Sequence, residues 1–192
     1  MGREFELKYA ANEAVLNDLL RHFGPGREIR MESTYFDTPA SALSCARMTL
    51  RLRRENDETV CTLKTPLPDG SRGEWECAAA DIKSGISALL ALGAPSVLQE
   101  LTAQGVVPVC GARFTRHAID LPTADGMAEL ALDKGILSGG GKEIPLLEVE
   151  IELKSGSEEA ACRLAAQLAK TYCLQPESKS KFRRAMDLFQ GE

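Results

Sequence analysis

Polar and apolar side chains alternate along much of the chain with a period of two residues, which is typical of β-strands. The clearest case is residues 145–154, where Glu148, Glu150 and Glu152 share one face and apolar residues share the other. This alternation, together with the turn signals between segments, predicts eight strands. They span residues 3–9, 28–38, 47–55, 59–65, 72–78, 112–121, 127–137 and 145–154. Three of the first five are joined by short connections, so we expect antiparallel pairing.

Apolar residues at helical spacing predict helices in the connections between the strands. The predicted segments are residues 12–23, a short turn at 40–45, two pieces within 81–104, a helix that opens at Ser157, and a last helix over 178–189. Asn12 is suited to cap the first of them. We therefore expect an α+β, mainly β, fold: an eight-stranded antiparallel closed β-barrel with helices packed outside. Such a barrel encloses side chains or one small ligand.

Length and composition narrow the class of protein. The 192 residues suggest a single domain over 1–192, and 44% apolar with 27% charged residues indicate an ordinary globular chain. A net charge of −5 disfavours a dedicated nucleic-acid binder. No apolar run approaches the roughly 20 residues of a membrane span, and the first residues show no signal peptide. Six cysteines without a CxxC pair, and only two histidines, disfavour structural zinc and indicate reduced thiols in a cytoplasmic protein.

The polar faces of the predicted strands carry charges in pairs. Arg51 and Arg53 lie on one strand, and Glu74 and Glu76 lie on another. On any single strand the ordinary interpretation is a solvated face. In a closed barrel, however, the charged faces line the lumen, where unpaired charge is costly. Basic groups hold phosphate oxygens and carboxylates hold Mg²⁺ or Mn²⁺, so the pattern favours a polyphosphate bound with a divalent metal.

A series of short motifs resembles the CYTH family, also called the triphosphate tunnel metalloenzymes. The first is the ExExK signature of Glu4, Glu6 and Lys8. The others follow in the family's order over essentially the whole chain: Tyr35-Phe-Asp-Thr38, Leu50-Arg-Leu-Arg53, Thr62-Leu-Lys64, Glu74-Trp-Glu76, Phe114-Thr-Arg116, Glu129-Leu-Ala-Leu-Asp133, Glu148-Val-Glu-Ile-Glu152 and Ser180-Lys181. The family fold is an eight-stranded antiparallel tunnel, in agreement with the predicted strands. The motifs look most like those of bacterial inorganic triphosphatases, without the CHAD domain that many of them carry.

The resemblance implies a role for each lumen residue. The triphosphate would be held by the basic set Lys8, Arg51, Arg53, Lys64, Arg116 and Lys181. One or two Mg²⁺ or Mn²⁺ ions would be held by the acidic set Glu4, Glu6, Asp133, Glu148, Glu150 and Glu152. Lys8 with Glu4 and Glu6 would form the catalytic group, and Glu74, Glu76 and Glu129 would complete the lumen. Arg113 and Arg116 have opposite parity on one strand, and the resemblance favours Arg116 as the lumen residue.

The activity that the resemblance implies is metal-dependent hydrolysis of the terminal phosphate of inorganic triphosphate. The basic residues would neutralise the phosphate chain, and charge stabilisation would carry most of the catalysis. Family members also hydrolyse thiamine or nucleoside triphosphates, or cyclise ATP, so a thiamine or nucleoside triphosphatase and a class IV-type adenylyl cyclase are alternatives. A polyphosphate- or nucleotide-binding module without turnover is a third. The expected partner is a small-molecule triphosphate, with no nucleic acid and no membrane; a homodimer stays open.

Two other motifs offer rival chemistry. Cys110 and Arg116 have the Cys-x5-Arg spacing of cysteine phosphatases. A single glycine in that segment and the lack of a preceding histidine disfavour this interpretation. Residues 139–142 fail as a phosphate loop because Ile136 stands where the leading glycine is needed, so we expect a hairpin turn there. Trp75 alternates with Glu74 and is expected under a helix outside the barrel.

Overall fold

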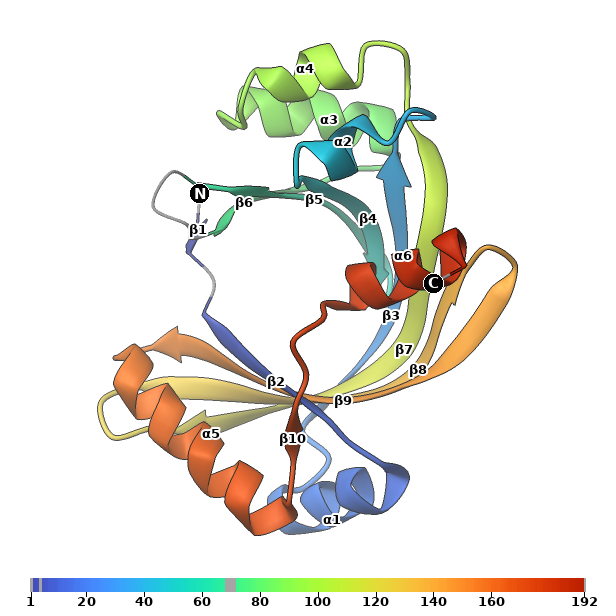
Figure 1. Cartoon of the computed structure of the whole chain (residues 1–192). Helices are drawn as coiled ribbons and strands as arrows, with labels where there is room; N and C mark the ends of the chain where they lie inside the picture. The colour runs from blue at the N-terminus through green and yellow to red at the C-terminus, as the bar shows by residue number, and fades with distance from the viewer. Residues whose placement is uncertain (1, 4, 68–71, 192) are drawn as a thin grey trace.

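The computed structural model describes residues 2–3, 5–67 and 72–191. Within them, one antiparallel sheet contains ten strands in the order β1–β6–β5–β4–β3–β7–β8–β9–β2–β10, and Figure 1 looks into the ring that it forms. The strands are β1 (Gly2–Arg3), β2 (Glu6–Ala10), β3 (Arg27–Asp37), β4 (Thr49–Glu55), β5 (Glu58–Pro66), β6 (Arg72–Ala78), β7 (Val107–Pro122), β8 (Met127–Gly139), β9 (Lys142–Ser155) and β10 (Gln175–Pro176). The mainly β, antiparallel fold is therefore confirmed.

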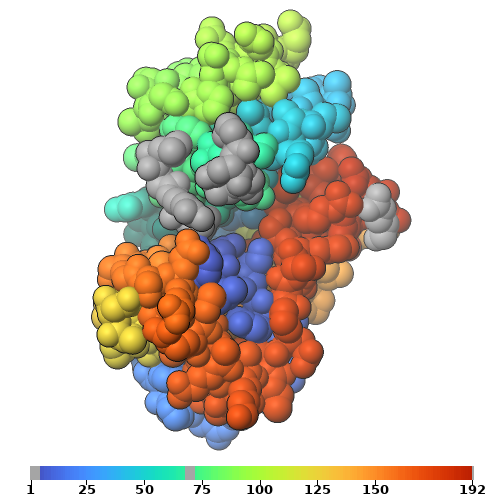
Figure 2. All heavy atoms as spheres, turned by 60° about the vertical axis from the view of Figure 1, so that its left-hand side comes forward, coloured from blue at the N-terminus to red at the C-terminus, as the bar shows by residue number. Residues whose placement is uncertain are grey.

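The N-terminal segment joins the two ends of the curved sheet. β1 pairs with β6, with Arg3 opposite Gly73, and β2 pairs with β9, with Glu6 opposite Glu152. Because β1 and β2 follow each other in the chain, this one segment contacts both ends of the strand order and completes the ring. The two-residue strand β10 was not predicted; it lies along β2. Figure 2 shows the N-terminal segment in blue between α5 in orange and the C-terminal segment in red.

Five helices cover the outer face of the described barrel: α1 (Glu13–Phe23), α2 (Ala42–Cys45), α3 (Ile82–Ala91), α4 (Val97–Leu101) and α5 (Glu158–Tyr172). α1 and α5 pack on the apolar faces of β2, β8 and β9, and the other three pack on those of β4, β5 and β6. Asn12 caps α1 as expected, since its Oδ1 accepts a hydrogen bond from the Val15 N–H at 2.9 Å. These two outer cores leave the charged strand faces to the lumen.

The last helix, α6 (Lys181–Gln190), lies on the other side of the sheet. Ala185 belongs to one buried cluster with Leu137 of β8 and Leu146 of β9, both of which project from the lumen faces of their strands. The Phe182 ring lies 5.1 Å from the Tyr35 ring of β3. α6 therefore packs against the inner face of the barrel at one end, so the prediction that the helices pack outside the barrel is wrong for this helix.

β7, β8 and β9 are longer than their predicted segments, and the added length supports α6. The sequence predicts a hairpin turn at 139–142, whereas β8 continues to Gly139 and the turn is made by Gly140 and Gly141, with φ of 58° and 75°. A Cβ on Gly139 would lie 2.3 Å from the Ala185 carbonyl oxygen. Glycine at this position allows α6 to approach the strand. Among the described residues, no helix has the length and apolarity needed to cross a membrane.

Candidate active site

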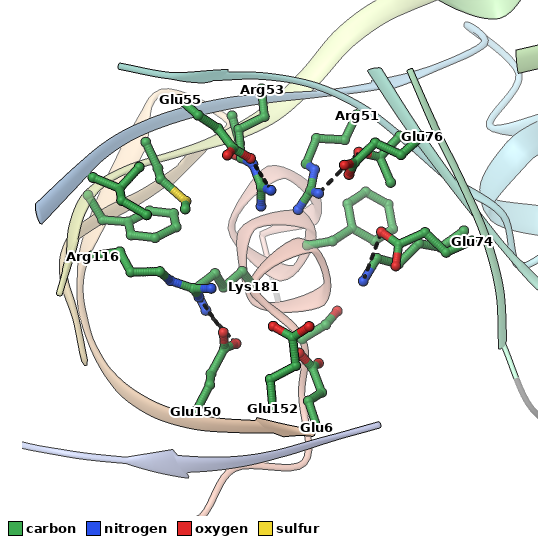
Figure 3. Close-up of a pocket in the computed structure, with 18 of the residues that line it drawn as sticks. Glu6, Arg51, Arg53, Glu55, Glu74, Glu76, Arg116, Glu150, Glu152 and Lys181 are labelled. Atoms are coloured by element: carbon green, nitrogen blue, oxygen red, sulfur yellow. Dashed lines mark hydrogen bonds and ion pairs between the residues drawn. The ribbon is translucent and has the colours of Figure 1, made fainter. Parts of the chain in front are cut away.

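The barrel lumen contains a cavity of about 860 Å³. Alternate residues of β2 to β9 line it, and the first turn of α6 borders it with Lys181 and Phe182. Figure 3 looks into this cavity, with α6 behind the labelled side chains. Most of the charged residues that the sequence assigns to the lumen do line this cavity. The inverted arrangement, with charges inside and apolar faces outside, is confirmed for the described strands.

One wall of the cavity is basic and is built by β4 and β5. Arg51 donates a hydrogen bond from Nη2 to Thr62 Oγ1 at 3.2 Å, and Arg53 forms an ion pair with Glu55. The Nε atoms of both arginines are buried and have no hydrogen-bond partner among the described residues. Burial and the neighbouring charge of Arg51 lower the pKa of Arg53. Buried N–H groups and crowded positive charge together favour an anion at this wall.

The opposite wall is acidic and is built by β2, β8 and β9. Glu6 lies directly across the strand pair from Glu152, and Glu152 lies directly across from Glu129, so three carboxylates form one row. Like charges in such positions destabilise a sheet unless cations offset them. Lys154 contacts Glu152 at 2.9 Å and Glu129 at 3.8 Å, which neutralises one end of the row. All three carboxylates line the cavity, so their oxygens are available as ligands for a cation.

Two lysines stand between the walls. Lys8 Nζ lies 3.6 Å from Glu6 Oε1, and Lys8 is also the direct cross-strand partner of Glu150. Lys64 Nζ lies 3.6 Å from Glu74 Oε1. Both ammonium groups line the cavity, as the family motifs predict for phosphate-binding side chains. Each lysine therefore places its positive charge next to a glutamate that also lines the cavity.

A buried network of ion pairs closes the cavity on the side of α6. Arg116 donates from Nε and Nη2 to Asp133 at 2.7 Å for each bond, and it also pairs with Glu150. Lys181 Nζ contacts Asp133 at 2.8 Å, Glu150 at 2.7 Å, and Glu148. The three carboxylates thus have oxygens within 4.8 Å of one another, a spacing that suits a metal ion, but the Lys181 ammonium lies among them.

The network shifts the titration of its members in opposite directions. Burial raises the pKa of Glu148 to about 7. Burial acts in the same direction on Glu150, but the charges of Lys181 and Arg116 outweigh it and hold the pKa of Glu150 well below its ordinary value. The carboxylates around Lys181 outweigh its burial and raise the pKa of its ammonium. Lys181 is consequently charged at neutral pH.

The remaining predicted lumen residues, and the choice between Arg113 and Arg116, can be placed as follows. Glu74, Glu76 and Glu129 line the cavity as expected. Glu4 lies outside the described residues. Arg113 is exposed on the outer face of β7, whereas Arg116 points into the lumen, so the parity argument is confirmed.

Four charged residues outside the predicted set are further functional candidates. Glu55 pairs with Arg53 inside the cavity. Arg27 and Asp120 line the same cavity, and Arg27 Nη2 reaches Glu129 at 2.9 Å. Arg184 of α6 donates to Glu148 at 2.6 Å. Its position three residues after Lys181 was the available signal, because residues three apart share a helix face.

The rival motifs do not form phosphate sites. Cys110 and Arg116 lie six residues apart on one extended strand, which separates them by about 20 Å, so they do not enclose a common ligand. Burial also raises the pKa of the Cys110 thiol to about 12, which disfavours the thiolate that a nucleophile needs. Residues 139–142 form the turn between β8 and β9. Trp75 packs outside the barrel beneath α3.

The Tyr35-Phe-Asp-Thr38 motif has a structural explanation in this fold. The Asp37 carboxylate is buried and accepts hydrogen bonds from the backbone N–H groups of Thr38 at 2.7 Å, Leu43 at 2.9 Å and Ser44 at 3.0 Å. It therefore fixes the segment that leads from β3 into α2. Tyr35 is the member of the motif that borders the cavity.

Comparison with known proteins agrees with this architecture. An inorganic triphosphatase from Haemophilus influenzae is 28% identical over 166 residues, which cover 82% of this chain and 47% of that protein. The chain therefore spans about half the length of this curated relative. A Bacillus halodurans protein described provisionally as an adenylate cyclase has a TM-score of 0.72 at 23% identity, with 96% of this chain and 98% of that chain covered.

A Hippeastrum protein shares the fold with a TM-score of 0.64 at 21% identity, covering 98% of this chain and 95% of that chain; it is described as an adenylyl cyclase candidate with a dominant triphosphatase activity. At these identities the solved structures show the fold alone. The CYTH domain family matches residues 2–186, nearly the whole chain. The tunnel of paired charges, the order of the motifs and this match together place the chain in the CYTH family.

Proposed function

We propose that the protein is a metal-dependent hydrolase that removes the terminal phosphate of inorganic triphosphate. One observation carries the proposal: two oppositely charged walls face each other across a single cavity (Figure 3). Arg51 and Arg53 present buried Nε atoms on one wall, and Glu6 and Glu152 lie on the other. A phosphate chain bridged to a divalent cation has charges that complement both walls.

The basic side chains bind and neutralise the phosphate chain. Arg51, Arg53 and Lys64 come from neighbouring strands, so their donors address one elongated anion rather than three separate ones. Lys8 lies at the border between the basic and acidic walls, where its ammonium is a further donor for the phosphate chain. Arg116 and Lys181 close the cavity on the side of α6. Such fixed charges stabilise a transition state whose negative charge is spread over phosphoryl oxygens.

The donor set fits a hard divalent ion. Glu6, Glu150 and Glu152 come from two adjacent strands and line the cavity. Carboxylate oxygens are the ligands that Mg²⁺ and Mn²⁺ take in proteins. When bound there, the ion supplies charge neutralisation and polarisation of phosphoryl oxygens. Glu4 belongs to the predicted set as well. His117 lies outside the cavity, with its Nδ1 2.9 Å from the Pro25 carbonyl oxygen, so carboxylates are the candidates for accepting the proton of the attacking water.

We propose inorganic triphosphate rather than an organic triphosphate as the substrate because the chain is similar to the inorganic triphosphatase of Haemophilus influenzae. We also infer a reducing, cytoplasmic environment, since all six cysteines are unpaired. The direct test measures phosphate release from tripolyphosphate, thiamine triphosphate and ATP, with Mg²⁺ or Mn²⁺ and with EDTA, while cyclic AMP is followed in the ATP reaction. We expect metal-dependent release that is fastest from tripolyphosphate.

Matched variants make the test specific. Glu6→Gln should abolish release, while Arg113→Gln, an exposed change on the outer face, should keep it. Cys110→Ala should also keep it, because the thiol lies in the α6 cluster and not in the cavity lining. Tight tripolyphosphate binding without release would favour the binding module, and cyclic AMP formation would favour the cyclase. Loss of activity in Cys110→Ala alone would overturn the metal mechanism.

A further inference from the structure

α6 forms one end of the lumen and is joined to the strands by an apolar cluster and by a small number of charged contacts. Its first turn lines the cavity through Lys181 and Phe182, so any displacement of the helix changes the shape of the cavity. Its apolar contacts with the strands centre on Ala185 and Met186, both buried. The polar half of the same interface is formed by the buried ion-pair network.

Two cations of α6 meet at one carboxylate. Lys181 and Arg184 are three residues apart and therefore share a helix face. Glu148 of β9 pairs with Lys181 through one oxygen, and its second oxygen accepts a hydrogen bond from Arg184 Nη1 at 2.6 Å. The Glu148 side chain is 0% exposed. Both of its oxygens are thus used by the helix.

The charges of this network balance without any added ion. When Glu148 is ionised, Asp133, Glu148 and Glu150 supply three negative charges, and Arg116, Lys181 and Arg184 supply three positive charges. A divalent cation placed among these carboxylates would have to displace the Lys181 ammonium and leave it buried without partners, which is costly. The spacing of the three acids suits a metal, but their surroundings do not.

Glu148 also differs from its two neighbours on the strand. Glu150 and Glu152 line the cavity, whereas Glu148 does not. We propose that Glu148, Arg184 and Lys181 form a latch that positions α6 at the end of the tunnel, and that Glu148 serves as a positioning residue rather than as a metal ligand. The catalytic part of this inference rests on the proposed triphosphatase function; the structural part does not.

The latch has a built-in reporter. Cys110 is buried in the same cluster as Ala185 and Met186, so displacement of α6 exposes its thiol further and speeds its reaction. The experiment measures the rate of Cys110 alkylation by peptide mass spectrometry, and Mn²⁺ affinity by electron paramagnetic resonance, in the whole chain. The variants are Glu148→Gln and Arg184→Gln. Arg183→Gln is the matched control, because Arg183 is 53% exposed and pairs with Asp187 of its own helix.

In both latch variants we expect Cys110 alkylation to accelerate by about tenfold or more, because a buried charge-assisted contact is lost. Mn²⁺ affinity should stay within about twofold, while KM for tripolyphosphate rises and kcat changes little. Arg183→Gln should match the wild type in all three measurements. Melting temperatures show whether each variant is folded. If Glu148→Gln does not fold, Arg184→Gln tests the same contact, because it changes the Arg184 side chain, which is more exposed than Glu148.

Loss of Mn²⁺ affinity in Glu148→Gln with unchanged Cys110 alkylation would overturn the latch and return Glu148 to the metal site. Unchanged alkylation in Arg184→Gln would overturn it as well. Neither readout depends on turnover. If the wild type binds Mn²⁺ but hydrolyses no triphosphate, the proposed function fails, and the alkylation rates still decide whether the latch exists.

Discussion

Glu6 of β2 and Glu152 of β9 are direct cross-strand partners whose carboxylates both line the lumen. Two acidic residues in that position repel each other. Lys8, 3.6 Å from Glu6, and Lys154, 2.9 Å from Glu152, offset part of this repulsion. A divalent cation held by both carboxylates would offset more of it, because each would supply ligand oxygens to the same ion.

Glu152→Gln should consequently weaken metal binding while leaving the stability of the metal-free protein nearly unchanged. In EDTA, we expect the free energy of unfolding to change by no more than about 1 kcal/mol, in either direction, since lost repulsion offsets the lost contact with Lys154. The rise in melting temperature that Mg²⁺ or Mn²⁺ gives the wild type should largely disappear. Thermal melts with and without metal measure both effects. A full metal-dependent rise in the variant would remove Glu152 from the metal site.

Arg116→Gln should destabilise the protein strongly. Among the described residues, the change leaves the buried Asp133 and Glu150 with Lys181 as their remaining ion-pair partner. Breaking a buried pair from one side costs about 3–5 kcal/mol. Chemical denaturation gives the difference in the free energy of unfolding. Arg113→Gln, three residues earlier on the exposed face, is the matched control, with an effect within about 0.5 kcal/mol. Similar losses in the two variants would contradict the described network.

Arg53→Gln should weaken substrate binding while sparing the free protein. Burial and the charge of Arg51 already disfavour the Arg53 guanidinium, as its lowered pKa shows, so its removal relieves repulsion. We expect tripolyphosphate to raise the melting temperature of the wild type and to have much less effect on Arg53→Gln. Isothermal titration calorimetry gives the affinities. Binding by the variant with wild-type affinity would exclude Arg53 from the phosphate site.

Asp37→Ala should act on the fold and leave the site intact. The carboxylate accepts three backbone N–H bonds in a buried position, and alanine leaves those donors unsatisfied. A loss of about 2–4 kcal/mol in the free energy of unfolding follows from unmet buried groups and a lost helix cap. Mn²⁺ affinity of the folded variant, measured below its melting temperature, should equal that of the wild type. A selective loss of Mn²⁺ binding would give the motif a role in the site.

Five of the six thiols should divide into two classes by burial in native alkylation; the sixth, Cys77, has intermediate exposure. Cys45, Cys162 and Cys173 are exposed and should react first at mildly alkaline pH. Burial raises the pKa of both Cys61 and Cys110 to about 12, so these two should react last, Cys61 on unfolding and Cys110 on unfolding or displacement of α6. Peptide mass spectrometry over time measures the order. Early modification of Cys110 in the wild type would show that α6 leaves the inner face readily.

Much of the site was predictable because side-chain direction along a strand is a local property. A period of two residues assigns Arg51 and Arg53 to one face and Leu50 and Leu52 to the other, whatever the strand pairs with. The choice between Arg113 and Arg116 also depends only on parity, once a family motif says which one is internal. The outer helices follow in the same way from apolar spacing and from caps such as Asn12.

Only the tertiary structure distinguishes residues that share one face of a strand and places the last helix. Glu148, Glu150 and Glu152 look equivalent in the sequence, and only the cross-strand register and the arrival of α6 distinguish them, since α6 buries the first and leaves the other two on the cavity. An amphipathic helix packs equally well by its pattern on either face of a sheet. Its place inside the barrel depends on long-range contacts, namely the close approach at Gly139 and the pairing of Arg184 with Glu148.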